Sequence, residues 1–193
     1  MQNRRLKRSA LLFLAATVSC VAVLSSMLAA ATVSGNARAI QANGEVLSDT
    51  GTLNSPTDAR ESSQTTGAIG SLVSGEALHA TTIGYSNEVA SEASVANVAM
   101  TAGGTTVTVD FAMARVDAGK GSDTGTADVK GLAINGYPVV VTGARNQRVD
   151  VPGGVVLINE QVKSAGGLVV NAVHVVIDGT ADVVIASATA KAQ

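Results

Sequence analysis

The chain has 193 residues, of which 46% are hydrophobic, 15% are charged and 2% are aromatic. This length suits one globular domain, and the low charge with 20 glycines argues against a disordered acidic or basic protein. Five of the 13 basic residues and none of the 15 acidic residues lie in residues 1–39, so residues 40–193 carry eight basic and 15 acidic residues, a net charge of −7. An acidic body repels phosphate backbones, and we therefore expect no nucleic-acid partner.

Residues 1–39 have the pattern of an export signal. Four cations within residues 1–8 precede an apolar run over 10–33, which are the charged and apolar regions of a secretory signal helix. Small residues at 29–31 and at 37–39 both fit the positions that a signal peptidase recognises. The sequence predicts cleavage between residues 31 and 39 without separating the two sites.

Two alternatives to cleavage between residues 31 and 39 also place the body outside the cytoplasm. The apolar run is long enough to span a bilayer, so residues 9–34 could remain as a membrane anchor. A lipoprotein modified at Cys20 is the second alternative, although its flanking residues fit a lipobox poorly. Cys20 is the only cysteine, so a chain cleaved after it has no disulfide and no thiolate site.

Residues 40–74 are rich in Gly, Ser, Thr, Asn and Asp, with Pro56 in the middle. Such composition is typical of a loop, and the sequence predicts a linker here, with the long loop over 49–70. The segment 37–47 could form a first strand of the main sheet.

From residue 75 onward the sequence predicts one β-rich domain, 75–193. Alternating residues of 106–116 are apolar, which is the period of a half-buried strand. Asn135-Gly136 is a strong hairpin signal, because both residue types tolerate positive φ. Turn signals every ten residues or so, without a convincing helix, predict an all-β fold: an antiparallel β-sandwich, with a barrel as the alternative. The expected strands lie at 77–85, 93–100, 106–116, 129–134, 139–141, 155–162, 168–177 and 183–190.

The longest run of strand-forming residues is 167–178, GLVVNAVHVVID. Both of its faces are apolar under strict alternation, and Asn171 and His174 interrupt them, one on each face. A sandwich strand with one wet face should alternate instead. We therefore expect the outer face of this strand to be covered by the 40–75 segment, or to face a partner subunit or a ligand.

No catalytic constellation is evident in the sequence. His174 and Asp178 would lie about 13 Å apart along one strand, too far for one to orient the other. A lone histidine in an apolar strand is more often a sheet-face residue than a catalyst. We therefore assign no catalytic role to His79 or His174. A hydrolase whose site is gathered from several loops, including either histidine, is the alternative.

The segment 117–128 is expected to be a polar loop at a hairpin tip. Its carboxylates Asp117, Asp123 and Asp128 are calcium candidates, because calcium takes six to eight oxygen ligands, commonly from Asp in Gly-rich loops. Their spacing does not match the alternating D-x-D-x-D pattern, so a solvated hairpin tip is the preferred interpretation. No cofactor is predicted.

Several segments resemble the choice-of-anchor P family of bacterial exported proteins. They are ASVANVAM at 93–100, GLAINGYPVVVTGARNQRVDVPGG at 131–154, LINEQ at 157–161, and GLVVNAVHVVIDG followed by DVVIASATAKA. The resemblance spans 75–191 and implies a β-rich extracellular domain with a surface or secreted role, and no catalytic residues. No sorting motif or apolar tail follows the last predicted strand, so a member of this kind is expected to be released or held by its N-terminal segment.

These observations together predict an exported cell-surface or secreted structural or binding protein with no identifiable catalytic activity. Its partners would be a surface ligand or an envelope component, and it could form a homo-oligomer. The alternatives are the secreted hydrolase and an adhesive module stabilised by calcium.

Overall fold

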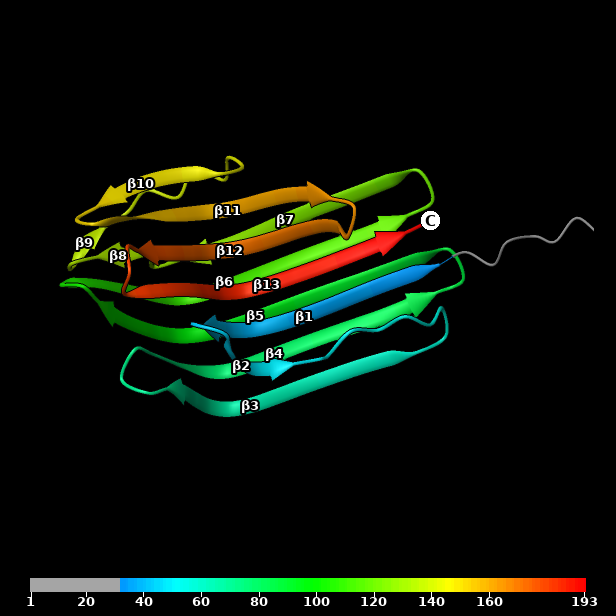
Figure 1. Ribbon diagram of the computed structural model, residues 1–193, viewed down its shortest axis with the longest axis horizontal. Coiled ribbons are helices and arrows are strands. Elements are labelled where there is room, and N and C mark those ends of the chain that lie inside the picture. Colours follow the sequence, from blue (N-terminus) through cyan, green and yellow to red (C-terminus); the bar gives the residue numbers. More distant parts are fainter. Residues whose placement is uncertain (1–31) are drawn as a thin grey trace, which may run out of the picture.

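The computed structural model describes residues 32–193, which form 13 β-strands and no helix. The strands build two antiparallel sheets packed face to face, a β-sandwich (Figure 1). Both sheets have open edges, so the barrel alternative is wrong. The predicted signal helix lies outside the described residues.

Sheet A contains the first two strands of the domain and the last four, in the order β10-β11-β12-β13-β1-β2. Strand β1 therefore lies inside the sheet, between β13 and β2. The strands are β1 (Val33–Ala42), β2 (Glu45–Asp49), β10 (Gln147–Val151), β11 (Gly154–Ser164), β12 (Gly167–Ile177) and β13 (Ala181–Ala192).

Sheet B contains the strands between them, in the order β3-β4-β5-β6-β8-β9, and β7 also pairs with β6. The turn between β8 and β9 is Asn135-Gly136, both with positive φ, as the sequence predicts. The strands are β3 (Ala59–Ile69), β4 (Val73–Tyr85), β5 (Glu88–Ala102), β6 (Thr105–Gly119), β7 (Ser122–Lys130), β8 (Ala133–Ile134) and β9 (Tyr137–Pro138).

Small aliphatic side chains fill the space between the sheets. The buried hydrophobic residues of the described chain are Val, Ala, Ile and Leu with Met100, while Phe111 is half-buried. Strands β1 and β13 pack over β4, β5 and β6. At Gly35 the approach is so close that a Cβ atom would lie 2.7 Å from both Ser91 Oγ and Thr82 Cγ2. Only glycine fits at this point of β1.

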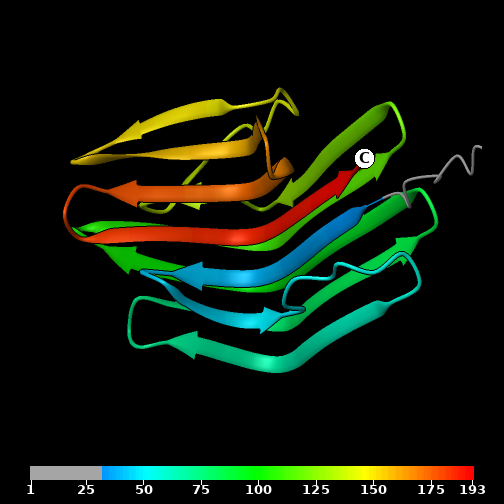
Figure 2. The same cartoon turned by 45° about the vertical axis from the view of Figure 1, so that its right-hand side comes forward.

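A bend crosses both sheets near the middle of the strands (Figure 2). We call it the crease and define it by five non-glycine residues with positive φ. Such a φ is uncommon for non-glycine residues, and here it interrupts the in–out alternation. Two consecutive side chains then point to the same side of the sheet. The crease residues are Ser48, Asn159 and Ala186 in sheet A, and Ala77 and Asn97 in sheet B.

The crease explains why β12 is apolar on both faces by strict alternation. Leu168 and Val170 are buried before the crease, and Val173 and Val175 are buried after it, because Ala172 and Val173 both point inward. The inward face thus changes parity within one strand. The expectation that the 40–75 segment covers this strand is wrong, because that segment forms parts of β1, β2, β3 and β4 elsewhere in the two sheets.

The segment 40–74 is therefore part of the sandwich and not a linker. Residues 59–69 were expected in a loop but form β3, the edge strand of sheet B. An edge strand has one free side and, here, mostly exposed side chains, so its Ser, Thr and Gln residues need no apolar pattern. The polar loop expected over 117–128 is likewise mostly strand, formed by the end of β6 and the start of β7.

Candidate functional site

A connected group of polar side chains surrounds His174, on the outer face of sheet A. His174 lies on β12, and the register places it opposite Leu157 of β11 and Val184 of β13. Two carboxylates from these neighbouring strands reach its ring: Nδ1 lies 2.8 Å from Oε2 of Glu160, and Nε2 lies 3.0 Å from Oδ1 of Asp182. Both carboxylates lie diagonally across the sheet from the histidine.

The charge state of His174 follows from this geometry. A neutral imidazole has one N–H, whereas the protonated ring donates from both nitrogens, which is what two carboxylate acceptors require. The hydrogen bond to Glu160 raises the pKa of His174 above 6.5, against the opposing effect of burial. The same hydrogen bond lowers the pKa of Glu160 below 4.5. The side chains are 19% and 15% exposed, so the pair is only partly screened by solvent.

Glu160 also connects the histidine to a second line of hydrogen bonds. Asn171 Nδ2 donates to Glu160 Oε2 at 2.7 Å, and Ser187 Oγ donates to Asn171 Oδ1, also at 2.7 Å. We call Glu160, Asn171, His174, Asp182 and Ser187 the His174 cluster. Its members come from three adjacent strands, β11, β12 and β13.

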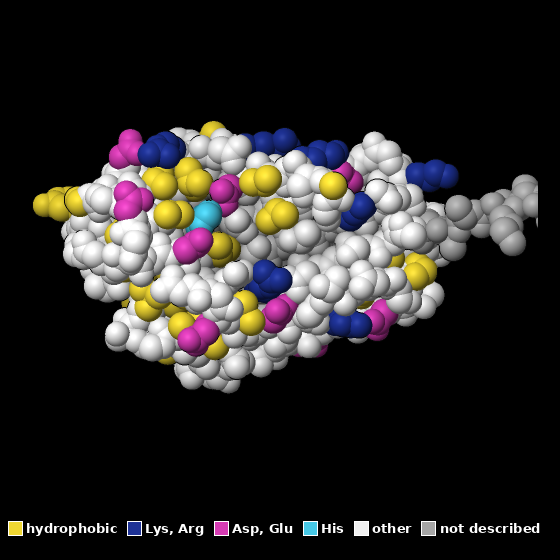
Figure 3. Space-filling model, viewed as in Figure 1, with side chains coloured by type: hydrophobic (Ala, Val, Ile, Leu, Met, Phe, Trp, Pro, Cys, Tyr) yellow, Lys and Arg dark blue, Asp and Glu magenta, His cyan; other side chains and the backbone are white. Residues whose placement is uncertain are grey.

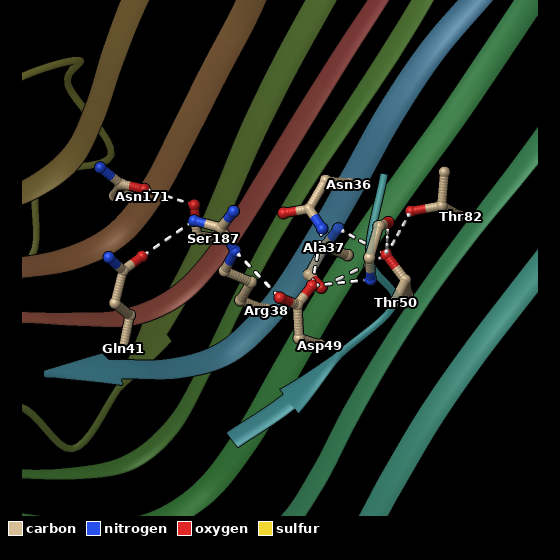
Figure 4. A network of polar contacts seen from close by, with 10 residues as sticks. Asn36, Ala37, Arg38, Gln41, Asp49, Thr50, Thr82, Asn171 and Ser187 are labelled. Atoms are coloured by element: carbon tan, nitrogen blue, oxygen red, sulfur yellow. Dashed lines mark hydrogen bonds and ion pairs between the residues drawn. The ribbon is translucent and has the colours of Figure 1, made fainter. Parts of the chain in front are cut away.

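Beyond Ser187, further polar side chains extend the His174 cluster across sheet A. The register places Ser187 opposite Arg38 of β1, and Arg38 opposite Asp49 of β2. Arg38 Nε lies 3.5 Å from Asp49 Oδ2, and Arg38 Nη1 donates to Gln41 Oε1 at 2.9 Å. Figure 4 shows these side chains on one side of the sheet, running from β12 towards the end of β2.

The crease brings these polar groups onto one face. Under strict alternation Asn171 and His174 would lie on opposite faces, as would Leu157 and Glu160. The inward pairs Ala172–Val173 and Ile158–Asn159 shift the parity, so that both Asn171 and Glu160 share the outer face with His174. The sequence prediction that Asn171 and His174 lie on opposite faces is wrong for this reason.

Half-buried aliphatic residues surround the His174 cluster. Leu157 and Val184 flank the histidine directly, and Val169 and Val176 lie further along β12. Val162, opposite Val169, is 48% exposed. Figure 3 shows hydrophobic side chains on both sides of the histidine on this face. The face therefore combines fixed charges with partly exposed apolar surface.

The cluster does not form a nucleophile–histidine relay. Both ring nitrogens of His174 face carboxylates, and Ser187 Oγ donates to Asn171. Asp178, which lies in the turn after β12, is not among the partners of His174. Glu160 and Asp182 were missed by sequence reasoning, because no local pattern indicates which residues the register places beside β12.

His79 lies on the outer face of sheet B, away from His174. Its Nε2 is 3.5 Å from Glu61 Oε1 and 3.4 Å from Thr81 Oγ1, and its side chain is 41% exposed. A shallow depression of about 300 Å³ runs beside it, lined by His79, Thr81, Tyr85 and Arg115 among others. The structure does not bring the two histidines together.

The three calcium candidates are also kept apart. Asp117 is bound by Arg115 and Asp128 by Lys130, whereas Asp123 pairs with Lys163 of the other sheet. Asp123 is opposite Ala118, which is buried, so it lies on the inner side, whereas Asp117 lies on the outer side.

Asp117 lies on β6, and Asp128 of β7 is paired with Met113, four residues before Asp117 on β6, a separation of about 13 Å along the strand. Within residues 32–193 no group of three or more His, Cys, Asp or Glu side chains is placed to hold a metal ion.

No protein-family model matches the chain, and no curated protein or solved structure matches it either. In the part of the chain that the structure describes, no helix is long and apolar enough to cross a membrane.

Proposed function

We propose that this protein is exported and acts outside the cytoplasm as a cell-surface or secreted structural or binding protein. The observation that carries the proposal is the boundary between leader and domain. The cationic start and apolar run cover residues 1–33, and the first strand, Val33–Ala42, begins where that run ends. The body that follows is one β-sandwich, with no second domain within residues 32–193.

The composition of the body supports a role outside the cell. A chain cleaved after Cys20 has no cysteine, so no disulfide stabilises it and oxidation of thiols cannot alter it. Its resemblance to the choice-of-anchor P family belongs to the same proposal, since such proteins are exported and β-rich.

The outer face of sheet A is the surface that we propose for binding. It presents the His174 cluster, whose charges are fixed by hydrogen bonds, between aliphatic side chains that remain partly exposed. Groups held in place before contact lose little conformational entropy on binding. The ligand would be a surface or envelope component.

Fractionation of the native host tests the proposal. An antibody against the folded body should find it in the medium or on the outer surface, where added protease can reach it. A variant carrying Leu12→Arg and Leu14→Arg interrupts the apolar run and should remain in the cytoplasm. Wild-type protein confined to the cytoplasm would contradict export.

A further inference from the structure

The two candidate cleavage sites, after Ala31 and after Ala39, differ in how much of strand β1 they leave in the mature chain. We propose that a signal peptidase hydrolyses the bond between Ala31 and Thr32, and that the mature chain begins at Thr32. This inference rests on the proposed export. Hydrolysis adds one water across the peptide bond, leaving a carboxylate on Ala31 and an ammonium on Thr32.

Residues 32–39 are a structural part of sheet A. Strand β1 pairs with β13 from Val33, opposite Ala192, to Ala42, opposite Val183. The side chain of Val33 is 3% exposed, and Ala37 and Ala39 are completely buried. Residues before Ile40 thus contribute buried side chains to the core as well as backbone pairing to sheet A.

The same residues also hold the segment that follows β2. Gly35 and Leu53 exchange two backbone hydrogen bonds, of 3.0 and 2.8 Å. The backbone N–H of Ala37 donates to Thr50 Oγ1 at 3.0 Å, and this contact is buried. Thr50 Oγ1 in turn lies 3.2 Å from Thr82 Oγ1 of sheet B, so β1 contributes to a polar link between the sheets (Figure 4).

Cleavage after Ala39 would remove most of this strand. Only residues 40–42 of β1 would remain, and most of β13 would become an unpaired edge. Unpaired backbone groups at such an edge invite pairing with other chains. The core would also lose the buried side chains of Val33 and Ala37. Cleavage after Ala31 leaves all of β1 in place.

A new N-terminus at Thr32 would lie beside the backbone of Gln193. Thr32 is exposed, and its backbone nitrogen lies 3.2 Å from the backbone oxygen of Gln193. The Gln193 N–H donates back to the Thr32 oxygen at 2.9 Å. Cleavage would turn the Thr32 amide into an ammonium, which strengthens the first of these hydrogen bonds by giving it a charged donor.

The experiment is to express the full chain in a secreting bacterial host, purify the exported protein, and determine its N-terminal sequence and intact mass. We expect a single species beginning at Thr32. Ala31→Phe places a bulky residue at the position next to the cut and should abolish this species. Ala30→Phe is the matched control, because the middle position of an A-x-A site accepts any residue.

Exported wild-type protein that begins at Ile40, or that retains Met1, overturns the inference and leaves the proposed export intact. Export with unchanged processing of Ala31→Phe also overturns it. Protein found only in the cytoplasm overturns both proposals. A start at Thr32 that Ala31→Phe abolishes and Ala30→Phe preserves supports the assignment.

Discussion

The outer faces of the two sheets each carry one histidine, in contrasting surroundings. His174 on sheet A is 19% exposed and lies between Glu160 and Asp182, which come from both neighbouring strands. His79 on sheet B is 41% exposed, and its carboxylate partner Glu61, itself 64% exposed, is 3.5 Å away. The two carboxylate acceptors favour the charged ring at His174 and outweigh the opposing effect of its partial burial. An exposed single pair of the kind at His79 contributes little to stability.

The difference originates in the crease. In sheet A the crease residues Asn159 and Ala186 are buried, and the parity change turns their neighbours Glu160 and Ser187 outward, towards β12. In sheet B the crease residues Ala77 and Asn97 are exposed. The positive φ at the crease therefore contributes to a polar cluster around His174 in sheet A, whereas among the described residues no such cluster forms around His79 in sheet B.

The largest effect is expected from Asn159→Val. A β-branched residue disfavours the positive φ at this position, and the substitution removes the bonds of the Asn159 amide to Gly143 and Gln161. We expect the free energy of unfolding to fall by about 3 kcal/mol, measured by urea denaturation.

Two control substitutions separate the causes. Asn159→Gly permits the φ and loses only the amide contacts, so it should cost about 1 kcal/mol. Asn97→Val places the same strain on the exposed crease of sheet B. If Asn97→Val proved as harmful as Asn159→Val, the two creases would not differ as described.

The next effect is expected from Glu160→Ala. It removes the acceptor of both His174 and Asn171, so the free energy of unfolding at pH 6 should fall by about 2 kcal/mol. The matched change on sheet B, Glu61→Ala, removes the partner of His79 and should cost less than about 0.5 kcal/mol. Equal losses in the two variants would contradict the contrast between the faces.

The smallest effect concerns pH. The pKa of His174 is raised, so its contribution to stability is complete below pH 6.5 and is lost as the pH rises through its folded-state value. The pKa of Glu160 is lowered, so its contribution is present above pH 4.5 and is lost as the pH falls through its folded-state value. Both contributions are present between pH 4.5 and 6.5, where we expect this cluster to stabilise the fold most.

His174→Gln should remove the part of this pH dependence that lies above pH 6.5, in urea denaturation series from pH 5 to 9. His79→Gln, which removes the histidine of the other sheet, serves as the matched control. A wild-type profile that His174→Gln does not flatten would show that the ring is not charged in the folded state.

The sequence predicted those parts of the fold that depend on short-range patterns. The Asn135-Gly136 turn was found because both residues adopt positive φ, and β12 was found because β-branched residues dominate it. Strand β3 was missed because its exposed edge position requires no apolar side chains. The crease was missed because alanine, the residue at positions 77 and 186, does not signal a positive φ.

The candidate site could not be predicted in the same way. Glu160 and Asp182 are 14 and 8 residues from His174 in the chain, and only the pairing of β11 and β13 with β12 places them at the ring. Sequence reasoning could test His174 against Asp178 because both fall in the run of strand-forming residues 167–178. It could not know which residues lie opposite on the neighbouring strands.

The sequence by itself determined that the body is all-β, that its core is aliphatic, and that its first residues resemble an export signal. Composition and the period of two are local properties, and they do not depend on how the strands are ordered. The tertiary structure alone decided that β1 lies inside sheet A, so that residues 33–39 pair with β13. It also decided that the crease turns Glu160, Asn171 and Ser187 to the face of His174. Both depend on the register between strands far apart in the chain, which side-chain patterns within one strand cannot specify.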